Sequence, residues 1–462
     1  MTSEKITQSP LQKLISYRWL ILLLISLVIG TNYYVYDALS SIKSVMQAQL
    51  GFSSTDYGLI VSFYSFPNTF FLMSVIGGII LDKWGIRKVG FIFVFLCLLG
   101  AAVTAYGASG SFRAGGFGYS FLGSFLTNFT PELKMMMFGR LLFGLGAETS
   151  IVVINKILVK WFKGKELALA FAVNISIARL GTAGALIFSP VLIKDPTGWT
   201  WAIWVATILM GLGFIVFIIY MFYDKKYDNY EKFDVGLAPD EEFHFKDILY
   251  LITNKSFIYI CLLCVTFYSA VFPFQAYCPD LLHNKFGLSL EWSGQLSSLI
   301  IWGTIVFTPV FGWFVDNRGR RASIMFLGSG LLIIAHLTLA LTHITPFVAL
   351  FILGIAFSLV PAAIWPSVAL IVEEKKLGTA YGIMGSIQNL GLFAFPILAG
   401  WLLDSSNPGV TVDMIEKGQA SLNYTYTILM FVGLGFLGWL FAALLKRNDR
   451  INGNSILEFT KK

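Results

Sequence analysis

Long apolar stretches recur from one end of this chain to the other, and they constrain its fold more than any other feature. The 462 residues contain twelve stretches of about 20 residues or more, each long enough to cross about 30 Å of hydrocarbon as a helix. Only 13% of the residues are charged, about half the share in a typical soluble protein, and the mean hydropathy is +0.73. The sequence therefore predicts an all-α membrane protein.

The twelve predicted transmembrane helices follow the apolar runs and are separated by polar loops. They cover about 18–40, 56–81, 89–108, 134–159, 167–193, 199–222, 256–280, 291–315, 323–342, 346–372, 378–403 and 425–445. An even number of spans places both termini on one side of the membrane. No small-residue cleavage pattern follows the polar N-terminal stretch, so we expect the first apolar segment to be a retained span.

The distribution of lysine and arginine predicts the orientation. Of the 33 basic residues, 24 lie in the tails and alternate loops on the terminal side, and six lie in the opposite loops. The other three, Arg140, Lys156 and Arg179, fall within spans. Because cytoplasmic loops are rich in lysine and arginine, both termini are predicted to be cytoplasmic. The net charge of +7 then reflects contact with anionic lipid headgroups, and we expect no nucleic-acid partner.

A charged loop motif occurs twice, after the second and after the eighth predicted span. Its glycine, aspartate and arginine are Gly78, Asp82 and Arg87 in one copy and Gly312, Asp316 and Arg320 in the other. The two aspartates are 234 residues apart, about half the chain. This repeat predicts two pseudo-symmetric six-helix halves, 1–222 and 256–462, joined by a polar cytoplasmic linker, 223–255.

The motif also predicts a conformational latch. A glycine one turn before the aspartate would allow a neighbouring helix to approach closely. The aspartate could then accept hydrogen bonds from the N-terminus of that helix. Another connection, the Gly-, Ser- and Phe-rich stretch 107–132, is long for a loop within one half. The sequence leaves open whether that stretch is an ordered cap or a flexible loop.

Arg140 begins the pattern RxxxGxG, with glycines at Gly144 and Gly146. One interpretation is an arginine that extends to the membrane interface. The other is a buried residue with a structural or coupling role, which holds the first and fourth spans together by hydrogen bonds.

Glu148 and Arg179 are the most informative residues in the sequence. At about 1.5 Å per residue, both lie about 18–21 Å deep in adjacent antiparallel spans, near the membrane midplane. Ionisable side chains at that depth are costly and usually functional. One interpretation is a structural ion pair between the two helices. The other is a pair of separate poles facing a central cavity, where a carboxylate binds an ammonium group and a guanidinium binds a carboxylate.

Further candidates for substrate contacts differ between the halves. In the first half, Tyr36 lies in the run that ends at Asp37, and Asn155 lies on nearly the same helical face as Glu148. Asp37 could simply be solvated at a helix end, and Lys156 could extend to the cytoplasm. The second half offers aromatic and amide groups, which serve equally well as contacts between helices: Tyr268, Gln275, Gln295, Trp302, Trp365, Tyr381, Gln388 and Asn389.

The duplicated loop motif resembles that of the major facilitator superfamily. Three longer blocks, Gly144 to Gly181, 365–372 and 377–404, resemble the family called major facilitator superfamily domain-containing protein 1, the lysosomal dipeptide transporters. This resemblance implies the major facilitator fold and movement of dipeptides by uniport through alternating access. It also implies that Glu148 meets the amino group of the peptide and that Arg179 meets its carboxylate. The sequence shows no nucleophile–base set and no metal-ligand cluster, so we expect no enzymatic activity, metal or cofactor.

Two departures from the family and two rival functions accompany this resemblance. The long 107–132 loop is not part of the family pattern, and the N-terminal tail has no acidic dileucine sorting signal. A bacterial cytoplasmic membrane is the simpler location, with a lysosomal membrane as the eukaryotic alternative, and an accessory subunit stays unknown. The rivals are a proton-coupled carrier of another small organic solute or anion, with Glu148 as the proton site, and a membrane sensor or scaffold that moves nothing.

Overall fold

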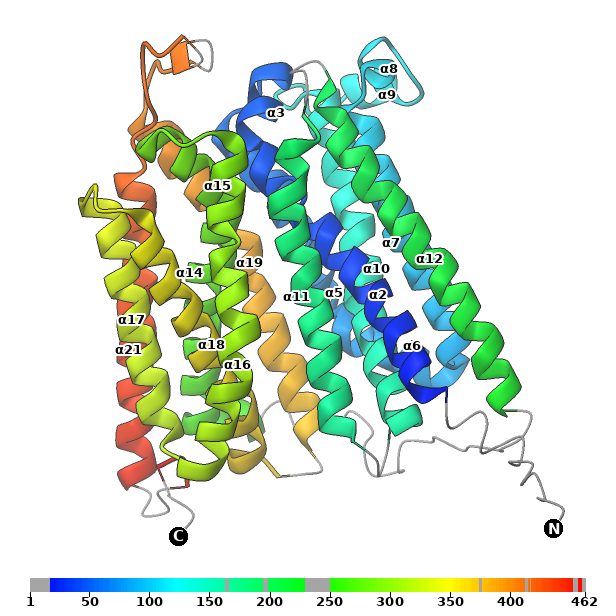
Figure 1. Cartoon of the computed structure of the whole chain (residues 1–462), viewed down its shortest axis with the longest axis vertical. Coiled ribbons are helices and arrows are strands. Elements are labelled where there is room, and N and C mark those ends of the chain that lie inside the picture. The colour runs from blue at the N-terminus through cyan, green and yellow to red at the C-terminus, as the bar shows by residue number, and fades with distance from the viewer. Residues whose placement is uncertain are drawn as a thin grey trace, which may run out of the picture.

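A computed structural model describes residues 17–162, 166–193, 198–228, 250–373, 376–411, 414–415, 417–451 and 456–458. Every regular element in these ranges is a helix, and the long helices run alongside one another (Figure 1). Eleven segments are long and apolar enough to cross a membrane. In the first half, their helices are α2 (Arg18–Asp37) continued by η1 (Ser40–Ile42) and α3 (Lys43–Leu50), α7 (Ile86–Ala108), α10 (Pro131–Phe162), α11 (Leu167–Val191) and α12 (Thr200–Asp228). In the second half, they are α14 (Lys255–Phe286), α15 (Leu290–Ser297) with α16 (Leu299–Arg318), α17 (Arg321–Leu341), α18 (Pro346–Ile371), α19 (Leu377–Ser406) and α21 (Thr425–Ile451).

The interval predicted as the second span, 56–81, is not one continuous helix. It is divided into α4 (Ser54–Ser62), α5 (Phe66–Phe71) and α6 (Met73–Trp84). Leu72, between α5 and α6, has φ 52° and ψ 44°, a left-handed conformation that ends a right-handed helix and is uncommon for a residue other than glycine. Because each piece is short, the described residues contain eleven helical segments of membrane length, where the sequence predicts twelve.

The two ends of the helix bundle differ. We call the end where α2 begins and α21 ends the terminal end, which is the lower end in Figure 1. The opposite, far end carries α3, α15 and the 107–132 stretch, which contains α8 (Gly110–Arg113) and α9 (Tyr119–Gly123). The ammonium group of Lys134 donates to the carbonyls of Phe125 (2.6 Å) and Leu126 (3.3 Å). The stretch is therefore an ordered cap, which decides between the two alternatives left by the sequence.

Buried side chains form two large clusters, one within the first half and one that contains residues of both halves. One cluster contains first-half residues alone, from Ile21 to Tyr220. The other contains the second-half core together with first-half residues of the far end, among them Leu39, Met46 and Tyr57. The second-half core therefore continues into the first half at the far end.

A buried ion pair joins the halves at this end. The Lys43 ammonium lies 2.6 Å from Oδ2 of Asp280, and the two side chains are 0% and 2% exposed. The hydroxyl of Tyr424 also donates to Asp280. Asp404, at the end of α19, accepts hydrogen bonds from the backbone N–H groups of Ser54 and Thr55, both at 2.8 Å, at the start of α4. These contacts close the far end.

The remaining hydrogen bonds between the halves in the described ranges also lie toward the far end. Tyr57 donates to the carbonyl of Ala276 (2.9 Å), and Tyr277 donates to the carbonyl of Ser54 (3.0 Å). The described residues form no hydrogen bond or ion pair between the halves at the terminal end. The structure thus shows a helix bundle whose two halves are joined at the far end.

The repeated loop motif differs in two respects from the sequence-based expectation. Asp82 pairs with Lys156 instead of accepting hydrogen bonds from a helix N-terminus. In the second copy, Asp316 is 77% exposed and lies 3.8 Å from Arg321. A Cβ atom placed on Gly78 or on Gly312 would meet no atom within 4 Å, so the expected close helix approach at these glycines is wrong. Both glycines face open space in this conformation, and no neighbouring helix of the described residues packs on them.

The basic residue of the first copy is nevertheless well anchored. Arg87 lies 2.8 Å from Asp224 and 2.5 Å from Asp228. Lys160 lies 2.7 Å and 2.6 Å from the same two carboxylates. This network ties the start of α7 to the ends of α10 and α12 within the first half. Arg320 of the second copy directly precedes α17 and has φ 52°.

Candidate functional site

A cavity of about 270 Å³ lies between the two halves. This volume is close to the lower end of the range for ligand pockets, about 300–1,000 Å³. The first half contributes the glutamate Glu148 and several tyrosines, and the second half contributes aromatic and amide side chains. The lining residues are Asn32, Tyr33, Tyr36, Tyr64, Asn68, Ser74, Phe143, Ala147, Glu148, Ile151, Phe272, Trp365, Tyr381, Gly385, Gln388, Asn389 and Leu392.

Glu148 is the ionisable carboxylate of this cavity, and α10 places it there. Its Oε2 atom accepts a hydrogen bond from Nδ2 of Asn68 at 3.2 Å. The hydroxyl of Ser74 lies 3.3 Å from the same oxygen. Both partners are neutral, and no cation of the described residues forms an ion pair with this carboxylate. A carboxylate in that environment can bind a positively charged group of a ligand.

Arg179, on α11, is not among the residues that line the cavity, but it lies behind two of them. Its guanidinium lies 4.9 Å from the ring centre of Phe357, 5.7 Å from that of Tyr33 and 5.9 Å from that of Phe272. Tyr33 and Phe272 both line the cavity, and the second of them belongs to the second half. The buried Nη1 atom of Arg179 has no hydrogen-bond partner in the part of the chain that the structure describes. Aromatic faces stabilise the cation while leaving its N–H donors available.

No ion pair joins Glu148 and Arg179, although both side chains are described. The salt bridges of the described residues lie elsewhere, at the terminal and far ends of the bundle. This arrangement favours the interpretation of two separate poles over that of a structural ion pair. A negative and a positive group are thus both presented by the first half.

The second half supplies a pre-arranged polar and aromatic wall. Nε1 of Trp365 donates to the hydroxyl of Tyr268 at 2.9 Å, and the hydroxyl of Tyr381 donates to the carbonyl of Trp365 at 3.1 Å. Nδ2 of Asn389 donates to the carbonyl of Gly385 at 3.1 Å, while its Oδ1 is buried without a partner. These contacts fix the rings and leave amide groups facing the cavity. The charge asymmetry expected from the sequence is therefore present in the cavity lining.

Comparison with known families agrees with this architecture. A family model described as Major Facilitator Superfamily matches residues 22–301 and 279–460, which together cover most of the chain. The chain belongs to the major facilitator superfamily. It is therefore an integral, multi-pass membrane protein of a transporter family, and that family is not a class of enzymes.

Individual relatives of this superfamily member differ in what they carry. The human lysosomal dipeptide transporter MFSD1 is 30% identical over 405 residues, which are 85% of this chain and 81% of that protein. A hexuronate transporter of Bacillus subtilis is 23% identical over 406 residues, covering 84% and 89% of the two chains. The solved structure of the nucleoside transporter NupG has a TM-score of 0.67 at 14% identity, with 92% of this chain and 99% of that chain covered. The structural likeness confirms the fold.

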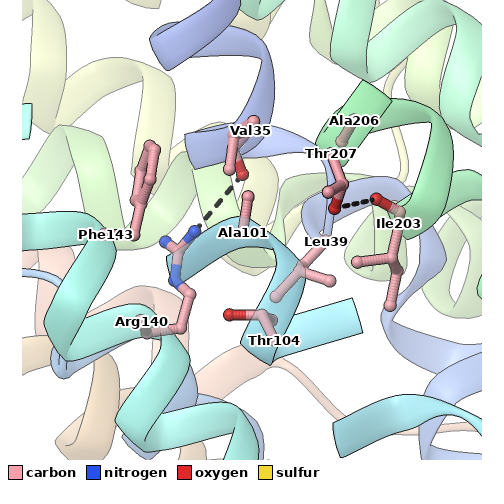
Figure 2. A pocket seen from close by; sticks show the side chains of 9 residues that line it. All are labelled: Val35, Leu39, Ala101, Thr104, Arg140, Phe143, Ile203, Ala206 and Thr207. Atoms are coloured by element: carbon pink, nitrogen blue, oxygen red, sulfur yellow. Dashed lines mark hydrogen bonds between the residues drawn. The ribbon is translucent and has the colours of Figure 1, made fainter. Parts of the chain in front are cut away.

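Arg140 has a structural position in this major facilitator protein. Figure 2 shows its guanidinium directed from α10 toward the carbonyl of Val35. Nη1 donates to that carbonyl and Nη2 to the carbonyl of Tyr36, both at 3.3 Å. The side chain is 2% exposed and lies against the rings of Tyr36, Tyr64 and Phe143. Arg140 thus joins α10 to α2, the two helices that the sequence analysis expects it to hold.

Several candidate residues lie away from the cavity lining. Asn155 is exposed, Trp302 is 42% exposed on α16, and Gln295 is exposed on α15. Gln275 donates from Nε2 to Oδ1 of the buried Asp37 at 3.2 Å, so it bridges the halves. These four were predicted from residue type and approximate helical face, which do not specify how neighbouring helices pack.

Two lining residues that matter were not predicted, Asn68 and Ser74. Both lie in the apolar interval expected to be an ordinary second span. The available signal was an asparagine directly after Pro67 in an apolar run, since polar groups in a span are usually paired or functional. The hydrogen bonds of these residues to Glu148 depend on the helix interruption, which the sequence pattern does not reveal.

Proposed function

We propose that this protein transports dipeptides by alternating access, as a uniporter. The observation that carries the proposal is a cavity lined by Glu148, with Arg179 against its Tyr33 and Phe272 rings and no ion pair between the two charges. A zwitterionic peptide has an ammonium group for Glu148 and a carboxylate for Arg179. Such charge-assisted hydrogen bonds are the strong ones in protein recognition. The 30% identity to a lysosomal dipeptide transporter supports the same substrate class.

The proposal includes a topology of twelve spans with both termini in the cytoplasm. In it, α4, α5 and α6 together form the interrupted second span, and the terminal end faces the cytoplasm. The bias of basic residues toward that side supports this orientation. The closed far end then faces the opposite compartment, and we propose that the cavity exchanges with the cytoplasm in this state.

A second candidate substrate class is an organic anion, since one relative is a hexuronate transporter. Arg179 alone would suit such a ligand. The Glu148 carboxylate in the same cavity disfavours it, because like charges repel strongly where water is scarce.

A ligand-induced thermal-shift measurement on purified protein tests the dipeptide proposal. We expect a free dipeptide to stabilise the wild type, and N-acetylated and C-amidated analogues to bind about 10- to 100-fold more weakly, because each lacks one charge-assisted contact. Glu148→Gln and Arg179→Lys should each abolish the stabilisation while the protein still folds. Matched substitutions at exposed positions, Glu291→Gln and Arg113→Lys, serve as controls. Normal dipeptide binding by either cavity variant would contradict the proposal, and stabilisation by hexuronate instead would support the second candidate.

Uniport has its own test in proteoliposomes. The rate of dipeptide uptake should be the same with and without a pH gradient across the membrane. A rate that rises with an imposed proton gradient would favour the proton-coupled carrier. Failure of labelled dipeptide to exchange in counterflow, in protein that still binds it, would favour a sensor or scaffold.

A further inference from the structure

The interruption of the second span at Leu72 changes the hydrogen-bond partner of the backbone N–H group of Ser74. In a continuous helix, the N–H group of Ser74 would donate to the carbonyl four residues earlier. Here it donates instead to Oδ1 of Asn68 at 3.0 Å. Asn68 is 1% exposed, so its side chain has no access to bulk water. The side chain of Asn68 therefore replaces a backbone acceptor at the start of α6.

This contact fixes the orientation of the Asn68 amide. A backbone N–H group can only donate, so the atom facing it must be the carbonyl oxygen Oδ1. The amide nitrogen Nδ2 must then point the other way, where it lies 3.2 Å from Oε2 of Glu148. A flipped amide would place its nitrogen against an N–H donor and its oxygen against a carboxylate. Asn68 is thus held as a donor to Glu148 by the backbone of the interruption.

The same segment touches the second half. The ring of Phe66 lies 5.8 Å from that of Phe393 on α19, and the ring of Phe70 lies 5.3 Å from it. Both phenylalanines belong to α5, which carries Asn68 on another face. Movement of α19 relative to the first half would therefore act on the helix piece that holds Glu148.

From this geometry we infer that Asn68 is a positioning residue for substrate recognition. It links the helix interruption at Leu72 to Glu148 and holds the carboxylate at one place in the cavity, so that the ammonium group of the substrate meets it without a search over rotamers. Pre-organisation of this kind raises affinity because less conformational freedom is lost on binding. The inference rests on the proposed function, since it assigns Glu148 to the amino group of a peptide.

The test compares the affinities of each variant for a free dipeptide and for its N-acetylated form. In the wild type the ratio of these affinities reports the contact with Glu148. Asn68→Leu, which has a similar size but no donor, should weaken binding of the free dipeptide about 10- to 100-fold and leave binding of the N-acetylated form unchanged. Asn174→Leu is the matched control, because Asn174 is a buried asparagine that donates to Ser26 and does not line the cavity. It should leave the ratio unchanged.

A second variant is needed in case Asn68→Leu does not fold, because that substitution removes the acceptor for the backbone N–H group of Ser74. In the double variant Leu72→Gly/Asn68→Leu, glycine adopts the positive φ of position 72 without steric cost. This gain in stability offsets the loss of the Asn68 acceptor. The double variant should fold and still lose the preference for the free amine. An equal loss of affinity for both ligands, or an unchanged ratio, would overturn the positioning role. If Glu148→Gln itself keeps the preference for the free amine, the proposed function fails instead, so the two failures are distinguishable.

Discussion

At the scale of single residues, two arginines in membrane-spanning helices have different surroundings. Arg140 uses both terminal nitrogens on backbone carbonyls of α2 and is almost fully buried. Arg179 faces three aromatic rings, and one of its buried nitrogens makes no hydrogen bond. Carbonyl partners make Arg140 a fixed link between helices, while the ring faces leave Arg179 with donors for a ligand. Residue type alone does not separate these two cases.

Substitution of Arg140 tests its role as a link. Arg140→Lys replaces a planar fork by a single ammonium group, which cannot reach both carbonyls in the same geometry. We expect the variant to lose about 1–3 kcal/mol of stability, seen as a lower unfolding temperature in detergent. Its preference for a dipeptide with a free amine should stay as in the wild type. Equal stability of Arg140→Lys and the exposed control Arg113→Lys would contradict the structural role.

At the scale of elements, glycines set the distances at which helices cross. A Cβ atom on Gly144 of α10 would lie 1.9 Å from the carbonyl oxygen of Tyr64. A Cβ atom on Gly181 of α11 would lie 2.1 Å from the carbonyl oxygen of Gly30 on α2. The obstacle in each case is backbone, which cannot move aside without displacing a helix. Small residues of this kind allow helices in a membrane to pack closely.

These crossings lead to a prediction with an internal control. Gly144→Ala and Gly181→Ala should each destabilise the protein by about 1–3 kcal/mol, because the added methyl group forces the helices apart. Gly78→Ala should leave the unfolding temperature unchanged, since its Cβ would meet no atom within 4 Å. Thermal unfolding of the three variants under one condition is the measurement. A destabilised Gly78→Ala variant beside intact crossing variants would show that the helix packing differs from that described.

At the scale of the whole molecule, the two halves are joined at the far end. Lys43 and Asp280 are buried there, and their attraction offsets the cost of removing both charges from water. Opening of the far end requires this pair to separate and become hydrated. The pair therefore contributes to the balance between the closed and open far end.

Breaking this pair should shift that balance. Lys43→Met or Asp280→Asn leaves one buried charge without its partner, at a cost of about 3–5 kcal/mol that opening of the far end relieves. We expect Ser54→Cys, placed at the seam, to react faster with a membrane-impermeant maleimide in either single variant than in the wild type. The double variant should react more slowly than the singles, because no unpaired charge remains. The native cysteines in the described ranges are buried and provide the background.

The opposite result would be informative as well. Equal labelling of Ser54→Cys in the wild type and in both single variants would mean that the ion pair does not influence opening. Slower labelling in the singles would mean that the far end closes by a different set of contacts.

The sequence by itself determined the membrane class, the duplicated loop motif, the bias of basic residues, and the charged residues Glu148 and Arg179. Hydropathy, charge and repeats can be read within short windows, because a bilayer imposes the same local requirement on every span. The structure confirms the helical fold, and it has a cavity between the halves that is lined by Glu148 and by aromatic and amide side chains.

Four features became known only from the tertiary structure. They are the interruption at Leu72, the orientation of Asn68, the open surroundings of Gly78 and the closed far end. Asn68 and Glu148 are 80 residues apart, and Lys43 and Asp280 are 237 residues apart. Such contacts arise from the packing of helices against one another, which apolar periodicity does not encode because every span is apolar on most faces. A polar residue in a span marks a position of interest, and its partner is known only once the helices are placed.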